Sequence, residues 1–145
     1  MAAKCETARE RDGKVYRPRV LVVDPMPEIC AVLAEVLPHY GLEVETAGFS
    51  DAVEVVRSRP KGFALALVSL RGAEGPRTLA RLRELEPGLP AVMMTGTVNE
   101  ATEEGLADLD VLVDILALVP KPFKMDELAA LLLRLATPTW SGGEA

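Results

Sequence analysis

The sequence has little of what several classes of functional site require. Only 4% of its 145 residues are aromatic, and there is a single histidine, His39. Cys5 and Cys30 are too few for a disulfide framework or a zinc site, so we expect free thiols in a reducing compartment. Acidic residues outnumber basic ones by 22 to 16, for a net charge of −6. This balance argues against a nucleic-acid-binding surface, which depends on positive charge.

Long hydrophobic runs are also missing. No apolar stretch approaches the roughly 18 residues of a membrane span, and Met1–Arg11 lacks the apolar core of a signal peptide. We therefore expect a cytoplasmic protein with neither a membrane nor a nucleic-acid partner. The 49% of apolar residues is enough for the core of one domain and excludes a mainly disordered chain.

Apolar periodicity alternates five times between strand and helix. Val20–Val23 is a continuous apolar run rich in β-branched residues, which is typical of a strand buried on both faces. The residues from Ile29 to Leu37 carry a helical stripe, and Gly41 stands where a helix would end. The remaining strands are predicted over 42–47, 63–70, 90–95 and 115–119, and the remaining helices around 52–56, 79–85, after Thr97, and 128–135.

The segments between these elements yield weaker predictions. Ser50 is the expected N-cap of its helix, and Thr97 with Glu100 matches a capping box. Residues 72–75 match no phosphate-binding motif and are interpreted as a flexible loop. We expect a flexible N-terminal arm over 1–18, a domain over 19–136 and a C-terminal tail over 137–145.

Short connections between alternating strands and helices predict an α/β fold, a doubly wound five-stranded parallel sheet with helices on both faces. In such sheets the site lies outside the carboxyl ends of the strands. The polar residues at those ends are Asp24, Ser69, Thr95 and Lys121. They are the candidate site.

The sequence over 19–136 resembles the receiver domain of bacterial two-component response regulators, the CheY-like domain with flavodoxin-like (βα)5 topology. The segments that carry the resemblance are Val20-Leu-Val-Val-Asp24, Tyr40-Gly-Leu-Glu-Val44 with Ala47, Thr95, and Lys121-Pro122-Phe123. The resemblance implies two carboxylates after the first strand and an Asp ending the third that together hold Mg²⁺. That last Asp would accept a phosphoryl group from a phosphohistidine, and the Thr and the Lys would bind its oxygens.

This sequence departs from the receiver pattern at three positions. Pro25 replaces the second acid after the first strand, and Ser69 stands at the phosphoacceptor position. Leu118 stands at the position of the aromatic switch residue. A serine cannot form the acyl phosphate of the family, and Asp24 alone is a weak candidate metal ligand. We therefore expect no Mg²⁺ or other cofactor, no catalytic residue, and an ion pair between Asp24 and Lys121.

The predicted function is a non-phosphorylatable pseudo-receiver, not an enzyme, that acts by binding a protein such as a histidine kinase, a regulator or a second copy. One alternative is a phospho-accepting receiver with an atypical site, although no Asp or Glu lies between Phe63 and Arg71. Another is a flavodoxin-like enzyme or nucleotide binder, which would need a glycine fingerprint and a nucleophile–base pair.

The predicted partner surface is the face of the fourth helix, fifth strand and fifth helix. Residues 100–114 contain six acids and no base. The chain is expected to be either a stand-alone receiver or one cut from a longer protein. The acidic residues expected to face a partner are Glu100, Glu103, Glu104, Asp108 and Asp110.

Overall fold

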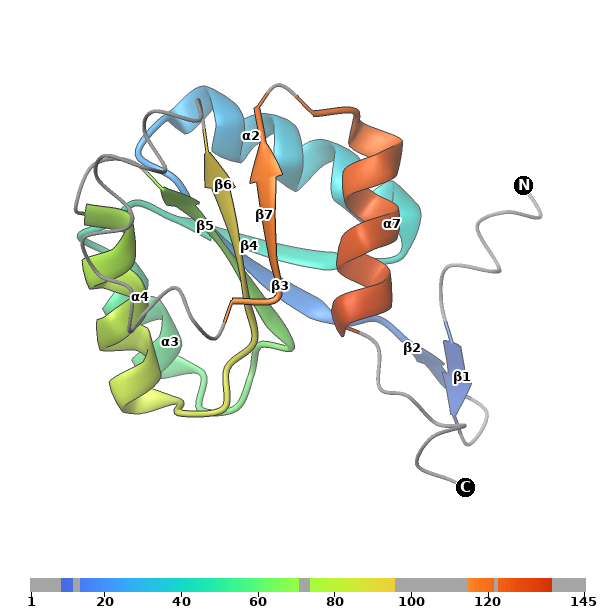
Figure 1. The fold of residues 1–145 in the computed structure, drawn as a ribbon. Coiled ribbons are helices and arrows are strands. Elements are labelled where there is room, and N and C mark those ends of the chain that lie inside the picture. Colours follow the sequence, from blue (N-terminus) through green and yellow to red (C-terminus); the bar gives the residue numbers. More distant parts are fainter. Residues whose placement is uncertain (1–8, 12–13, 71–73, 96–114, 122, 137–145) are drawn as a thin grey trace.

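The computed structural model describes residues 9–11, 14–70, 74–95, 115–121 and 123–136. Within them a five-stranded parallel sheet has the order β4-β3-β5-β6-β7 (Figure 1). This confirms the predicted fold class. Its strands are β3 (Arg19–Val23), β4 (Glu43–Ala47), β5 (Leu65–Leu70), β6 (Ala91–Thr95) and β7 (Ala117–Pro120).

Helices cover both faces of the sheet and divide the core in two. Val20 and Val22 of β3 belong to one buried cluster, whereas Leu21 and Val23 belong to the other, because successive side chains of a strand point to opposite faces. The first cluster lies under α2 (Pro27–Val36), the 3-10 helix η1 (Leu37–Tyr40) and α7 (Met125–Ala136), and the second under α3 (Ala52–Ser58) and α4 (Glu74–Leu85) (Figure 1).

One of the two predicted helix boundaries in this region is confirmed and the other is wrong. Gly41 follows η1 in the left-handed conformation, with φ of 94°, as the sequence predicts. α3, however, begins at Ala52 with Asp51 as its N-cap, and Ser50 does not cap it. The carbonyl of Gly48 accepts hydrogen bonds from the N–H groups of Asp51 and Ala52 at 3.2 and 3.1 Å, so a backbone turn satisfies amides that a serine hydroxyl would otherwise bind.

α4 begins earlier than its leucine pattern indicates. Glu74 and Gly75 form its first turn, so the prediction of a flexible loop over 72–75 is wrong for these two residues. Glycine has a low helix propensity, but Gly75 is buried against β5. Tertiary packing therefore overrides the local preference. No helix in the described part of the chain is both long and apolar enough to cross a membrane.

Two short strands precede the domain, where the sequence predicts only a flexible arm. β1 (Arg9–Arg11) and β2 (Lys14–Tyr16) pair antiparallel, with Arg9 opposite Tyr16. The missed signal is the dipeptide Asp12-Gly13, which favours two-residue hairpin connections. The domain limits of 19–136 stay a prediction, and the tail over 137–145 and the capping box of Thr97 and Glu100 lie outside the described residues.

Candidate functional site

The carboxyl edge of the sheet brings together the four polar residues that the sequence singles out. Asp24 follows β3, Ser69 lies near the end of β5, Thr95 ends β6, and Lys121 follows β7. Asp24, Ser69 and Thr95 are all buried, with 2%, 1% and 5% of their surface exposed. Buried polar side chains in folded proteins have hydrogen-bond partners as a rule, so the positions of these three side chains are restricted by the partners they need.

An ion pair joins Asp24, which follows β3, to Lys121, which follows β7. Lys121 Nζ lies 3.2 Å from Asp24 Oδ2, as the sequence predicts. The Asp24 side chain is fully buried and the Lys121 side chain is 19% exposed. The Lys121 N–H donates to the Thr95 carbonyl at 2.7 Å, which fixes the backbone from which the ammonium reaches Asp24.

The second oxygen of the Asp24 carboxylate is also occupied. The Met26 N–H donates to Asp24 Oδ1 at 2.8 Å, while the Asp24 N–H donates to the Ala47 carbonyl at 3.1 Å. Both carboxylate oxygens thus have partners within the chain. The Met26 contact is not among the predictions from the sequence, although an aspartate before a proline favours such a local turn.

Cys30 contacts the same aspartate from α2. Its thiol lies 3.5 Å from the Asp24 carbonyl oxygen. Burial raises the pKa of the Cys30 thiol, and the negative charge of Asp24 raises it further, while the backbone hydrogen bond lowers it. Because the thiolate is the reactive form, this shift makes Cys30 a poor nucleophile at neutral pH.

A groove of about 510 Å³ opens beside Asp24, between α2 and the segment that follows β4. The exposed Pro25 lines it and contributes no side-chain oxygen. Asp51 is the second carboxylate on its wall. Within the described ranges, no group of three or more His, Cys, Asp or Glu side chains is placed to hold a metal ion.

Ser69 lies where β5 meets the first turn of α4. It is opposite Met94 in the register of β5 and β6. A Cβ atom added to Gly75 would overlap the Ser69 carbonyl oxygen and lie 3.2 Å from the Leu70 Cα. The helix therefore touches the strand backbone, and only glycine allows this approach. The sequence places Gly75 only in a predicted flexible loop, because nothing in the local pattern shows what the residue faces.

The remaining candidates are either separate from this cluster or outside the described residues. Leu118 lies on β7 and is 47% exposed, and the nearby Leu116 is 48% exposed. Its role as a switch position stays a prediction. The other predicted site and partner-surface residues lie outside the described part of the chain. They are Pro122, Glu100, Glu103, Glu104, Asp108 and Asp110.

A parallel sheet of this strand order, with an acid, a hydroxyl residue and a lysine at its carboxyl edge, is the arrangement that the sequence resemblance to receiver domains predicts. The chain belongs to the response regulator receiver domain family, whose model matches residues 20–133.

Known relatives agree with this assignment. The probable transcriptional regulatory protein TcrX of Mycobacterium tuberculosis is 33% identical over 93% of this chain and 57% of its own length. The transcriptional regulatory protein TcrA of the same species is 34% identical over 86% and 48%. This chain thus spans about half the length of these curated relatives. The non-phosphorylated HemR receiver domain of Leptospira biflexa superposes with a TM-score of 0.68 at 27% identity, covering 85% of this chain and 97% of that one.

Proposed function

We propose that this chain is a receiver domain that does not accept a phosphoryl group and that signals by binding another protein. The observation that carries the proposal is the buried ion pair between Lys121 and Asp24. In the family pattern that lysine binds the phosphoryl group, whereas here its ammonium is already engaged. Acyl phosphate formation also needs a carboxylate, and the aligned position is Ser69.

The polar edge is poorly suited to Mg²⁺. This ion is held by hard oxygen ligands at short range in a strict octahedral arrangement. Asp24 is the one acid directly after β3, both of its oxygens have partners, and Pro25 supplies none. A metal ion here would have to displace Lys121 from a fully buried carboxylate, at a large electrostatic cost. We therefore propose a domain without a bound metal and without catalytic activity.

The proposed partner is a protein, either a histidine kinase, a regulator or a second copy. Its contact surface is proposed to include β7, α7 and the acidic residues of 100–114, with Leu118 among the exposed apolar positions. The relatives are named as transcriptional regulators, and this chain spans half of each. A phospho-accepting function has less support, because no Asp or Glu lies between Phe63 and Arg71.

Incubation with acetyl phosphate and Mg²⁺ should leave the mass of the protein unchanged. A serine in place of the acceptor carboxylate cannot form an acid-labile acyl phosphate, and the melting temperature should be the same with and without millimolar Mg²⁺. Intact-mass spectrometry and thermal unfolding test both points. A phosphoryl adduct together with a Mg²⁺-dependent rise in melting temperature would contradict the proposal.

The double variant Pro25→Asp/Ser69→Asp should become sensitive to Mg²⁺. It places three carboxylates around one lysine, so their repulsion lowers stability until a divalent ion binds. Mg²⁺ at about ten times its Kd should then stabilise the fold by about 1.4 kcal/mol. Pro25→Asn/Ser69→Asn is the matched control, since it has nearly the same shape without the charges. Equal responses of the two variants to Mg²⁺ would show that the residues do not meet at one site.

A further inference from the structure

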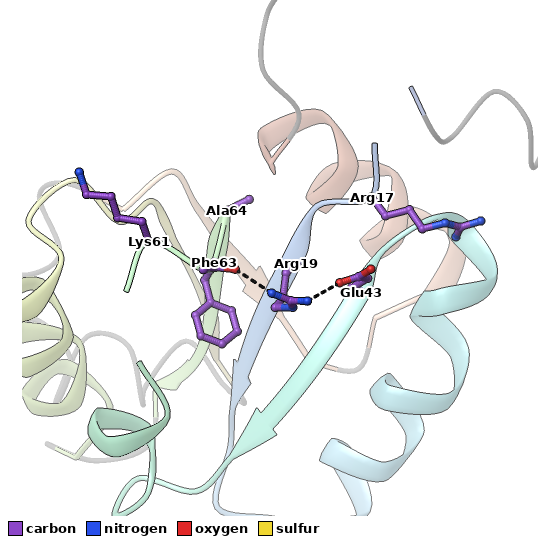
Figure 2. Close-up of a pocket in the computed structure, with 7 residues that line it drawn as sticks. Arg17, Arg19, Glu43, Lys61, Phe63 and Ala64 are labelled. Atoms are coloured by element: carbon purple, nitrogen blue, oxygen red, sulfur yellow. Dashed lines mark hydrogen bonds and ion pairs between the residues drawn. The ribbon is translucent and has the colours of Figure 1, made fainter. Parts of the chain in front are cut away.

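A second groove, with a mainly polar lining, lies at the amino edge of the sheet, at the opposite end of the strands from Asp24. Its volume is about 330 Å³ (Figure 2). It is formed by the residues that enter β3, by the start of β4 and by the turn that leads into β5. The lining residues are Arg17, Arg19, Glu43, Lys61, Gly62, Phe63 and Ala64.

This groove is positive in a chain that is negative overall. Three cations and one carboxylate line it, whereas the whole sequence has a net charge of −6. Arg19 occupies the centre: its guanidinium lies 2.8 Å from Glu43 Oε1 and donates a long hydrogen bond of 3.5 Å to the Gly62 carbonyl (Figure 2). These contacts hold the Arg19 side chain in place at the groove.

The other two cations differ from Arg19 in having no carboxylate paired with their side chains among the described residues. Among the residues that the structure describes, neither the Arg17 guanidinium nor the Lys61 ammonium forms an ion pair. Figure 2 shows them on opposite sides of Arg19. Three positive groups are therefore spread along one edge instead of converging on a single point.

The backbone at Lys61 is also unusual. Its φ is 55°, the left-handed region that disfavours residues with a side chain, and no other non-glycine residue of the described part has a positive φ. The Lys61 N–H donates to Glu86 Oε2 at 2.7 Å, which ties this turn to the residue after α4. Glycine would suit the conformation better, so the lysine side chain is present despite a local cost. Such outliers occur preferentially where a side chain has a function.

We propose that this groove binds an extended acidic segment of a partner protein. Carboxylates of the segment would meet Arg17, Arg19 and Lys61 in turn. Small-molecule sites are enclosed and mainly apolar, whereas this groove is open and its lining is mainly polar. The proposal concerns the edge opposite Asp24 and does not depend on whether Ser69 is phosphorylated.

A fluorescein-labelled hexaglutamate peptide, titrated into the full chain at low ionic strength, tests the proposal by fluorescence anisotropy. We expect saturable binding that weakens as salt is added. Arg17→Gln and Lys61→Gln should each weaken it about threefold, as for single exposed charge contacts. Glu43→Gln removes the negative charge from the groove and should tighten binding by about the same factor.

Arg57→Gln is the matched control. It removes one positive charge as the groove variants do, but Arg57 is exposed on α3, pairs with Glu54 and does not line the groove. It should leave binding unchanged. An equal loss in Arg57→Gln would mean that the peptide senses overall charge. A failure of Glu43→Gln to tighten binding would mean that the peptide does not occupy this groove. Either result would overturn the proposal.

Two further measurements separate the remaining outcomes. Lys61→Gly should weaken peptide binding while keeping the melting temperature at or above that of the wild type. The loss of binding then does not come from unfolding. Inorganic pyrophosphate is the probe for a small-anion site. If pyrophosphate binds with the same dependence on Arg17 and Lys61 while hexaglutamate does not bind, the acidic-segment proposal is wrong.

Discussion

Lys121→Met is expected to lower the free energy of unfolding by about 3 kcal/mol. The Asp24 carboxylate is fully buried, and among the described residues the substitution leaves it with one hydrogen bond, from the Met26 N–H, and no opposite charge. A buried charge that loses its partner costs far more than the intact pair contributes, because the charge can no longer be solvated. Urea denaturation at neutral pH measures the difference.

Two companion variants make this result specific. Asp24→Asn in the Lys121→Met background should recover much of the loss, since the buried charge is then absent, and the resulting double-mutant cycle measures the coupling directly. Lys124→Met is the control, because Lys124 is exposed only three residues away. Its effect should stay within about 0.5 kcal/mol. If Lys121→Met changes the free energy of unfolding as little as Lys124→Met does, the Asp24 charge is balanced in some other way.

Gly75→Ala should also destabilise the fold by about 3 kcal/mol, at the upper end for overpacking. The added methyl group would overlap the Ser69 carbonyl oxygen and crowd the Leu70 Cα. All of these are backbone atoms of a central strand, so no side-chain rotation relieves the overlap. Either α4 must move away from β5 or the strand end must shift. The melting temperature and the urea midpoint should both fall.

Gly88→Ala provides the reference for this experiment. The same methyl group at Gly88 would have no atom within 4 Å. This variant should therefore show almost no change in stability, or a small gain from a less flexible unfolded chain. If Gly75→Ala behaves like Gly88→Ala, the close approach of α4 to the end of β5 is not a feature of the folded protein in solution.

The sheet could be predicted from the sequence because its central strands are buried on both faces. Val20–Val23 and Leu65–Leu70 are almost continuously apolar, a pattern that few other structures produce. Once the strands are parallel, their carboxyl ends must share an edge. The meeting of Asp24 with Lys121, 97 positions apart in the sequence, therefore follows from topology and charge.

Other features depend on tertiary contacts that leave no periodic signal. The first turn of α4 contains Gly75, a residue of low helix propensity, and close packing against the Ser69 backbone requires a glycine there. The amino-edge groove combines three separate segments, around Arg19, Glu43 and Lys61, and none of them has a motif of its own. The positive charge of the groove can be predicted only when the register of β3 with β4 and β5 is known, because that register brings the three segments together.

The contact between Lys121 and Asp24 has a consequence for how information could pass through the proposed signalling module. A two-state protein responds to an input only if that input binds one state more tightly than the other. Under the proposed function Lys121 stays against the buried Asp24 carboxylate, so neither an ion nor a phosphoryl donor would bind one state of this edge more tightly than another. Under the proposed function the output is then set by abundance: the cell would adjust the signal by making or degrading the protein, not by chemically switching it.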